Sequence, residues 1–224
     1  MGTGLRVSTR SGSVRVIAER RDDVEVVRGP APEVDHQGRT VVAGSADRVV
    51  VRVPLGLDVT VGTNSGAVRL RGRLGAVAVT TGSGRVDIEA ADRVDVRAGS
   101  GGVVIGAVAG EARIAAGTGR AVVTSAGSVH IVASSGRVDV GRCSGPARVR
   151  AVSGRVRLVI DDPQPDVDVE TMSGRVDVFV GSGVAPAVLA TTRTGLVRTD
   201  VVQGDDGRIG VRAMSGTVRV RAAT

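Results

Sequence analysis

A two-residue motif, Ser or Thr followed by Gly, returns along this chain at a nearly constant spacing. Intervals of 17 or 18 residues separate six consecutive copies, at Gly66, Gly84, Gly101, Gly119, Gly136 and Gly154. Each copy begins an alternation of outward and apolar residues, as in RVDV after Gly136 and RVRL after Gly154. A glycine turn followed by period-two alternation is typical of a strand with one buried face. A chain with this regularity must be read as a repeat array before any local motif.

Weaker turns lie midway between the glycine motifs, so one repeat holds two strands and two turns. Such a short unit cannot bury its apolar stripe alone and needs neighbouring copies stacked on it. We therefore predict an all-β fold, a parallel β-solenoid with two strands per turn of about 17–21 residues. Its core would contain the alternating apolar residues, among them Val138, Val140, Val156 and Leu158. An antiparallel sandwich is the alternative, but sandwiches rarely repeat one phrase at constant spacing.

The repeat lengthens after Gly154, where the next motifs fall at Gly174, Gly195 and Gly216. All the added residues lie in the second turn, so the longer loops should stack as a ledge on one side, and insertions on one side of a solenoid often form its binding face. The candidate ledge residues are Asp161, Asp162, Gln164, Gln203, Asp205 and Asp206. These carboxylates suit a hard divalent cation, although a solvated acidic corner is the simpler interpretation, and we assign no metal site.

The first part of the chain is less regular than the rest. We predict an N-terminal β cap over residues 1–37 and one continuous solenoid domain over residues 38–224. The final motif at Gly216 leaves too few residues for a second cap. The C-terminal repeat should then expose unpaired backbone groups, which favour a homodimer through the C-terminal solenoid edge.

Composition excludes several classes of enzyme. All 30 basic residues are Arg, so a P-loop lysine or a Schiff-base lysine is impossible. Only two histidines are present, His36 and His130, which leaves almost no material for a catalytic triad or a histidine metal site. We expect no catalytic residue, no cofactor and no metal, and a protein that is not an enzyme.

One cysteine, Cys143, permits no internal disulfide. The beginning of the sequence has no apolar core of a secretory signal, and its longest uncharged stretch is too short to span a membrane as a helix. We expect no transmembrane segment and a cytoplasmic location, or an envelope-associated one if a leader or anchor has been removed.

Arginine recurs at outward positions just after the glycine motifs, and stacked repeats would align these side chains on one face. The candidate polyanion-binding residues are Arg120, Arg137, Arg155, Arg157, Arg175, Arg198 and Arg219. A solvated surface is the simpler interpretation. The sharper hypothesis is contact with an anionic polymer or with lipid headgroups. Nucleic acid is disfavoured, because sequence-tolerant single-strand binders usually add aromatic stacking platforms and the chain has no Trp or Tyr and one Phe.

The repeated SGxVxV phrase, GSVRVIAERRDDVEVV near the start and VRVPLGLDVTVGTNSGAVRL at the entry to the repeats resemble the bacterial β-strand-repeat family whose members carry an adhesin label. The resemblance covers nearly the whole chain. It implies a β-solenoid-like fold, a link to the cell surface or to envelope stress in some relatives, and no established enzyme activity. A more distant resemblance, in architecture alone, is to bactofilins.

Two functions follow as hypotheses. The first is a non-enzymatic structural or interaction module, associated with the cell envelope, that presents its Arg-rich face to an anionic partner. The alternative is a self-assembling, bactofilin-like cytoplasmic scaffold.

Overall fold

The computed structural model describes residues 4–44 and 48–223, and all the regular elements among them are β-strands. The alternating sequence explains this, because a period of two keeps one row of side chains inside and the other outside. The strands are β1 (Leu5–Thr9), β2 (Val14–Glu19), β3 (Glu25–Arg28), β4 (Glu33–Val34), β5 (Thr40–Gly44), β6 (Val49–Pro54), β7 (Val59–Ser65), β8 (Val68–Ser83), β9 (Val86–Cys143), β10 (Ala147–Ile160), β11 (Asp166–Val180), β12 (Ala187–Asp200) and β13 (Arg208–Ala222).

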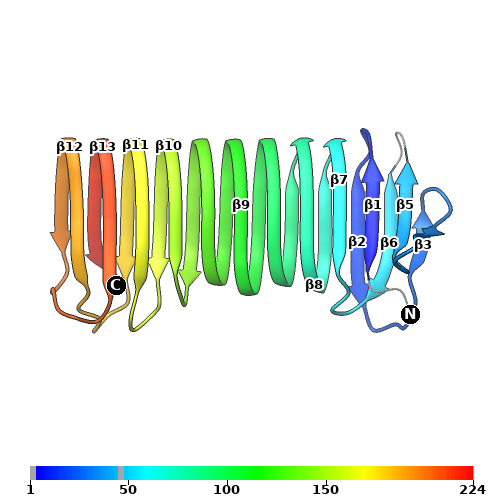
Figure 1. The fold of residues 1–224 in the computed structure, drawn as a ribbon, viewed down its shortest axis with the longest axis horizontal. Coiled ribbons are helices and arrows are strands. Elements are labelled where there is room, and N and C mark those ends of the chain that lie inside the picture. Colours follow the sequence, from blue (N-terminus) through cyan, green and yellow to red (C-terminus); the bar gives the residue numbers. More distant parts are fainter. Residues whose placement is uncertain (1–3, 45–47, 224) are drawn as a thin grey trace. The chain divides into compact units, whose positions relative to one another are not determined.

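The expected β-solenoid is confirmed. Strands from β9 onward bend through the Ser/Thr-Gly corner without ending, so one element contains both sides of a coil of the chain (Figure 1). Neighbouring coils pair in parallel and in register, with Ser153 of β10 opposite Ser173 of β11 and Gly154 opposite Gly174. The chain divides into two compact units, Met1–Ala109 and Gly110–Thr224.

The core is a column of small aliphatic side chains. Val138, Val140, Val156 and Leu158 are all fully buried, as the alternation predicts. Slim residues suit the interior, because the two sides of each coil are joined by tight corners.

The corner glycines are required by close approach as well as by backbone angle. Gly154 has φ of +125°, and a Cβ there would overlap the carbonyl oxygen of Gly136 on the neighbouring coil. Gly174 is placed in the same way over Gly154. In the second turn the requirement differs from coil to coil: Gly207 has φ of +95° and an added Cβ would lie 2.5 Å from the Pro165 carbonyl oxygen, whereas Asp92 does not have a positive φ.

In the first unit, β1 and β2 belong to the parallel stack. β1 pairs with β5 on one side and β7 on the other, and β2 pairs with β6 and β8. The strands with a capping arrangement are β3 and β4, which pair antiparallel with β6 and β5. Residues 5–19 therefore form a coil within the stack, and the domain boundary at residue 37 stays a prediction.

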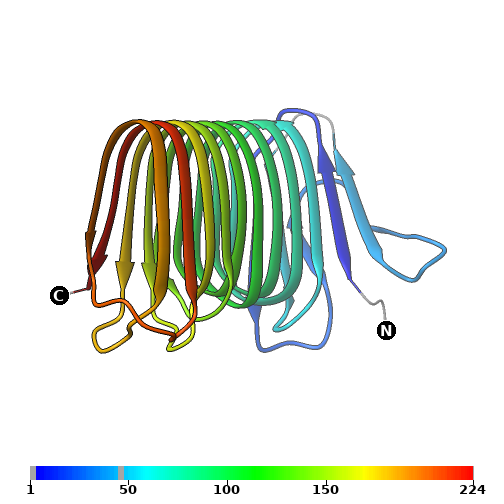
Figure 2. The ribbon, with the colours of Figure 1, turned by 60° about the vertical axis from the view of Figure 1, so that its left-hand side comes forward.

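In the second unit, the order of coils differs from the order of the sequence. β13 lies between β11 and β12 and pairs in parallel with both, so β12 is the outer strand (Figure 2). The prediction that the C-terminal repeat exposes an open edge is therefore wrong: the open edge belongs to β12. The inward residues give a reason, because β13 carries Ile209 and Val220 where β12 carries Val188 and Thr199. The more apolar coil occupies the more buried place.

Candidate anion-binding face

The first row of the candidate face is formed by the residue that directly follows each corner glycine. Arg137, Arg155 and Arg175 stand in register on β9, β10 and β11. Paired strands lie about 4.8 Å apart, so the row places like charges close together. Arg120 reaches this row from β9, since its Nε lies 3.7 Å from the Asp139 carboxylate that also contacts Arg137.

A second row lies two residues further along each strand, and here acids and arginines alternate from β9 to β13, where Arg219 is followed by a second arginine on β12. Asp139, Arg157, Asp177, Arg219 and Arg198 are successive partners across β9, β10, β11, β13 and β12. The seven predicted arginines thus fall into two rows of one face. Because β13 lies inside β12, Arg219 is nearer the centre of the face than Arg198.

Among the seven predicted arginines, those at the β9 end of the face, Arg120 and Arg137, are ion-paired. Asp139, whose side chain is 17% exposed, lies 2.7 Å from Arg137. Within residues 4–44 and 48–223, no ion pair involves the other predicted arginines, Arg155, Arg157, Arg175, Arg198 and Arg219. The guanidinium of Arg157 stacks on the ring of Phe179, 5.0 Å from its centroid. Stacking leaves a cation free for an anion while fixing its position.

Sequence reasoning missed one arginine of the same face. Arg221 stands opposite Phe179, two residues beyond Arg219, and its Nε lies 3.8 Å from the Asp200 carboxylate. The alternation that selected Arg219 extends to Arg221 and could have found it.

A shallow groove of about 390 Å³ runs across β9, β10, β11 and β13 beside this face. One side is a row of ion-paired residues: Glu170 accepts from Arg150 at 3.1 Å and lies 3.0 Å from Arg212. The other side is an apolar row, Val152, Met172 and Met214, each about half exposed. Buried Ala151 and Thr171 lie between the two sides. The signal in the sequence was the apolar residue directly before Ser-Gly in three repeats.

The loop ledge forms where the sequence places it, but its carboxylates have local partners. Asp206 accepts a bond from the Ala185 amide at 2.9 Å, Asp162 accepts from the Gln164 amide at 2.9 Å, and Asp161 lies 3.2 Å from Arg142. Gln203 and Asp205 are exposed in the loop that follows β12. Among the described residues no group of three or more metal-binding side chains occurs. The ledge's binding role stays a prediction.

The remaining reactive side chains are set apart from the face. Cys143 is buried, its Sγ lies 3.3 Å from the Gly145 carbonyl oxygen, and burial raises the pKa of its thiol. His130 is half-buried at the outward position opposite Arg148, and His36 is exposed in the loop between β4 and β5.

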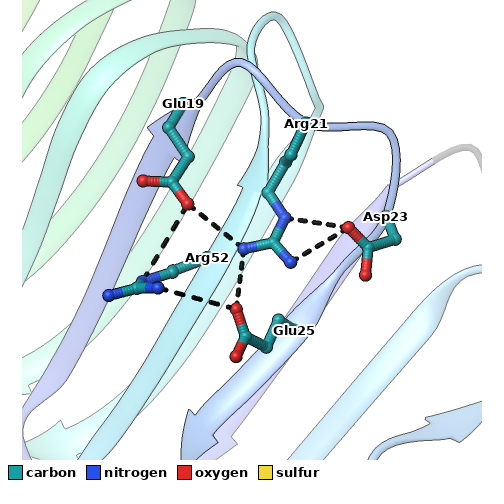
Figure 3. A network of polar contacts seen from close by, with 5 residues as sticks. All are labelled: Glu19, Arg21, Asp23, Glu25 and Arg52. Atoms are coloured by element: carbon teal, nitrogen blue, oxygen red, sulfur yellow. Dashed lines mark hydrogen bonds and ion pairs between the residues drawn. The ribbon is translucent and has the colours of Figure 1, made fainter.

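Arginines of the first unit show the contrasting arrangement. Arg21 lies between the carboxylates of Glu19, Asp23 and Glu25, at 3.2, 2.9 and 2.9 Å, and Arg52 approaches two of these acids (Figure 3). Its hydrogen bond with Glu25 is the main reason that the pKa of Arg21 is raised. This network joins β2, β3 and β6 and has a structural role, unlike the row from Arg155 to Arg175.

The fold and these charged rows define a β-solenoid of repeated coils with an arginine-lined face. A family model described as Toastrack DUF4097 matches residues 5–221, and the chain belongs to this family, whose function is unknown. This confirms the resemblance to an adhesin-like repeat family; similarity to bactofilins is not shown.

One similar solved structure is that of a “putative cell adhesion protein” from Clostridium sporogenes, with 8% identity over 99% of this chain and 94% of that chain. The TM-score is 0.24, so this likeness carries no argument about function. No curated protein matches the sequence.

Proposed function

We propose that the protein is a non-enzymatic interaction module whose second unit binds an anionic partner through its arginine face. The observation that carries the proposal is the set formed by Arg155, Arg157 and Arg175 on β10 and β11, none of which forms an ion pair with the described residues, although Arg157 stands opposite Asp139 and Asp177. Three fixed cations on two adjacent strands give a positive potential that a single exposed arginine does not. Packed aliphatic side chains position these residues from below, so the face needs little ordering when it binds.

Three features support an interaction module over an enzyme. The chain has no lysine, its cysteine is buried, and the two histidines lie apart from each other in the sequence and apart from the face. Nothing in this set resembles a nucleophile with an adjacent base. A location in the cytoplasm or at the envelope stays a prediction, and no helix among the described residues is long and apolar enough to cross a membrane.

Binding to immobilised heparin, a soluble polyanion, tests the proposal. Retention should fall steeply as the salt concentration rises and the Debye length shortens below about 10 Å. A neutral matrix of the same type is the control. Absence of retention on heparin at low ionic strength would mean that the face is only solvated.

Self-assembly is the second candidate function, and the outer strand β12 favours it. Its inward residues Val188, Ala190 and Val197 are partly exposed, whereas the inward residues of β13 are buried. An unpaired parallel edge is a template for a second chain. In this second candidate function, the homodimer that the sequence predicted at the C-terminal edge would instead form through β12.

A further inference from the structure

The apolar row of the groove, which lies next to the Ser-Gly corner of the second unit and is called the apolar corner below, stands between two rows of charged residues. Val152, Met172 and Met214 are 49, 53 and 51% exposed, on three successive paired strands. They are outside the core and, with Val132, are the large exposed apolar residues of the groove that they line. Large apolar side chains exposed side by side mark an interaction surface more often than isolated ones do.

Arginines lie on both sides of these residues, but those on the side of Arg150 and Arg212 are ion-paired with Glu170 and Asp168. Two residues before Val152 lies Arg150, and three residues after it lies Arg155. Met172 has Arg175 in the same following position, and Met214 has Arg212 in the preceding one. The only acid of the groove, Glu170, is already bonded to Arg150 and close to Arg212.

This combination distinguishes between the anionic partners. A polysaccharide or nucleic acid backbone offers charge but no apolar region in which the exposed methionines could be buried. An anionic bilayer offers phosphates for the arginines and, directly below them, an apolar region for the corner. Methionine suits this role because its flexible thioether adapts to an irregular surface.

We propose that the corner formed by Val152, Met172 and Met214 enters the interface of an anionic lipid bilayer while Arg155 and Arg175 bind lipid phosphates. This inference rests on the proposed function, since it names the partner of the same arginine face. Neither row is sufficient: the arginines supply attraction to the surface, and the apolar corner supplies the preference for lipid over a soluble polyanion.

The chain offers a clean test because it contains no Trp and no Tyr. In Met172→Trp, the new indole would be the only one in the protein. Its emission should shift to the blue, and acrylamide quenching should fall, when vesicles of phosphatidylglycerol and phosphatidylcholine are added. Vesicles of phosphatidylcholine alone should have no effect. Leu189→Trp is the matched control, since Leu189 is 66% exposed on β12, outside the groove.

A second variant protects the test against poor folding of the tryptophan protein. Met172→Ser with Met214→Ser should bind anionic vesicles at least about tenfold more weakly, because two partly buried side chains no longer leave water on binding. Its retention on heparin should stay within about twofold of wild type, since no charge is changed.

The outcomes separate the two proposals. If wild type binds heparin but not anionic vesicles, or if both tryptophan variants shift alike, the lipid inference fails and the proposed function stands. Equal loss of heparin and vesicle binding in the double serine variant also overturns the inference. If wild type binds neither ligand, the proposed function fails as well.

Discussion

Each corner glycine lies against the backbone of the neighbouring coil, so the addition of a single methyl group there should lower the free energy of unfolding substantially. Gly154→Ala places a side chain at φ of +125° and against the Gly136 carbonyl oxygen. Backbone strain of this kind costs about 1–3 kcal/mol, and the overlap adds to it. Gly62→Ala is the control, because its φ is not positive and no atom lies within 4 Å of the added Cβ. Thermal melts should show a large loss for Gly154→Ala only; equal melting temperatures would contradict the close contact.

The buried thiol gives a second prediction for a single residue. Burial is the largest cause of the raised pKa of Cys143, so the folded protein holds its proton at a pH where the unfolded chain has lost it. The free energy of unfolding should therefore fall as pH rises past the ordinary thiol pKa of 9.0, up to the folded value. Chemical denaturation of wild type and Cys143→Ala across this range measures the difference. A free energy of unfolding of the wild type that rises with pH over this range, relative to Cys143→Ala, would contradict the prediction.

At the scale of elements, the groove wall formed by β10, β11 and β13 predicts a gain of binding. Glu170 is the shared partner of Arg150 and Arg212. Glu170→Gln removes its charge and takes away the ion-pair partner of Arg150, whereas Arg212 keeps Asp168 at 3.3 Å, so heparin should be retained to a higher salt concentration. Glu33→Gln, in exposed β4 of the first unit, makes the same change in net charge. If the two variants elute together, the groove wall takes no part in binding.

The sequence predicts which residues of a strand are buried better than it predicts which strands are neighbours. Alternation alone identifies Val138 and Val156 as core residues. It cannot place β13 between β11 and β12, because the three coils share one motif spacing and fit each other in several orders. The polar residue Thr199 at an inward position of β12, where β11 has Val178 and β13 has Val220, carries the missing information, since it tolerates the outer place. The face was predicted in the same way: Arg155 and Arg175 follow from alternation, whereas the pairing of Asp139 with Arg137 depends on side-chain geometry.

At the scale of the whole molecule, the outer strand decides whether copies associate. Val197 points inward on β12 but is only half-buried. In Val197→Lys the ammonium can reach water in a monomer and would be trapped between coils in a dimer. Light scattering over a concentration series should show a wild-type dimer that this variant abolishes, with little change in melting temperature. A wild-type monomer at high concentration would rule out self-assembly through β12.

The central claim is that anion binding belongs to one face of the second unit and does not follow from net charge. Replacing Arg155, Arg157, Arg175 and Arg198 by Ser removes four charges from that face. A matched variant replaces four exposed arginines of the first unit that lie outside the rows after the corner glycines, Arg6, Arg10, Arg28 and Arg48. The most direct measurement is the affinity of both variants for heparin as a function of salt. We predict a loss of at least about tenfold at low salt and a shallower salt dependence for the first variant, with a small change for the second. Equal losses would show that binding follows the total charge of the chain and would contradict the assigned face.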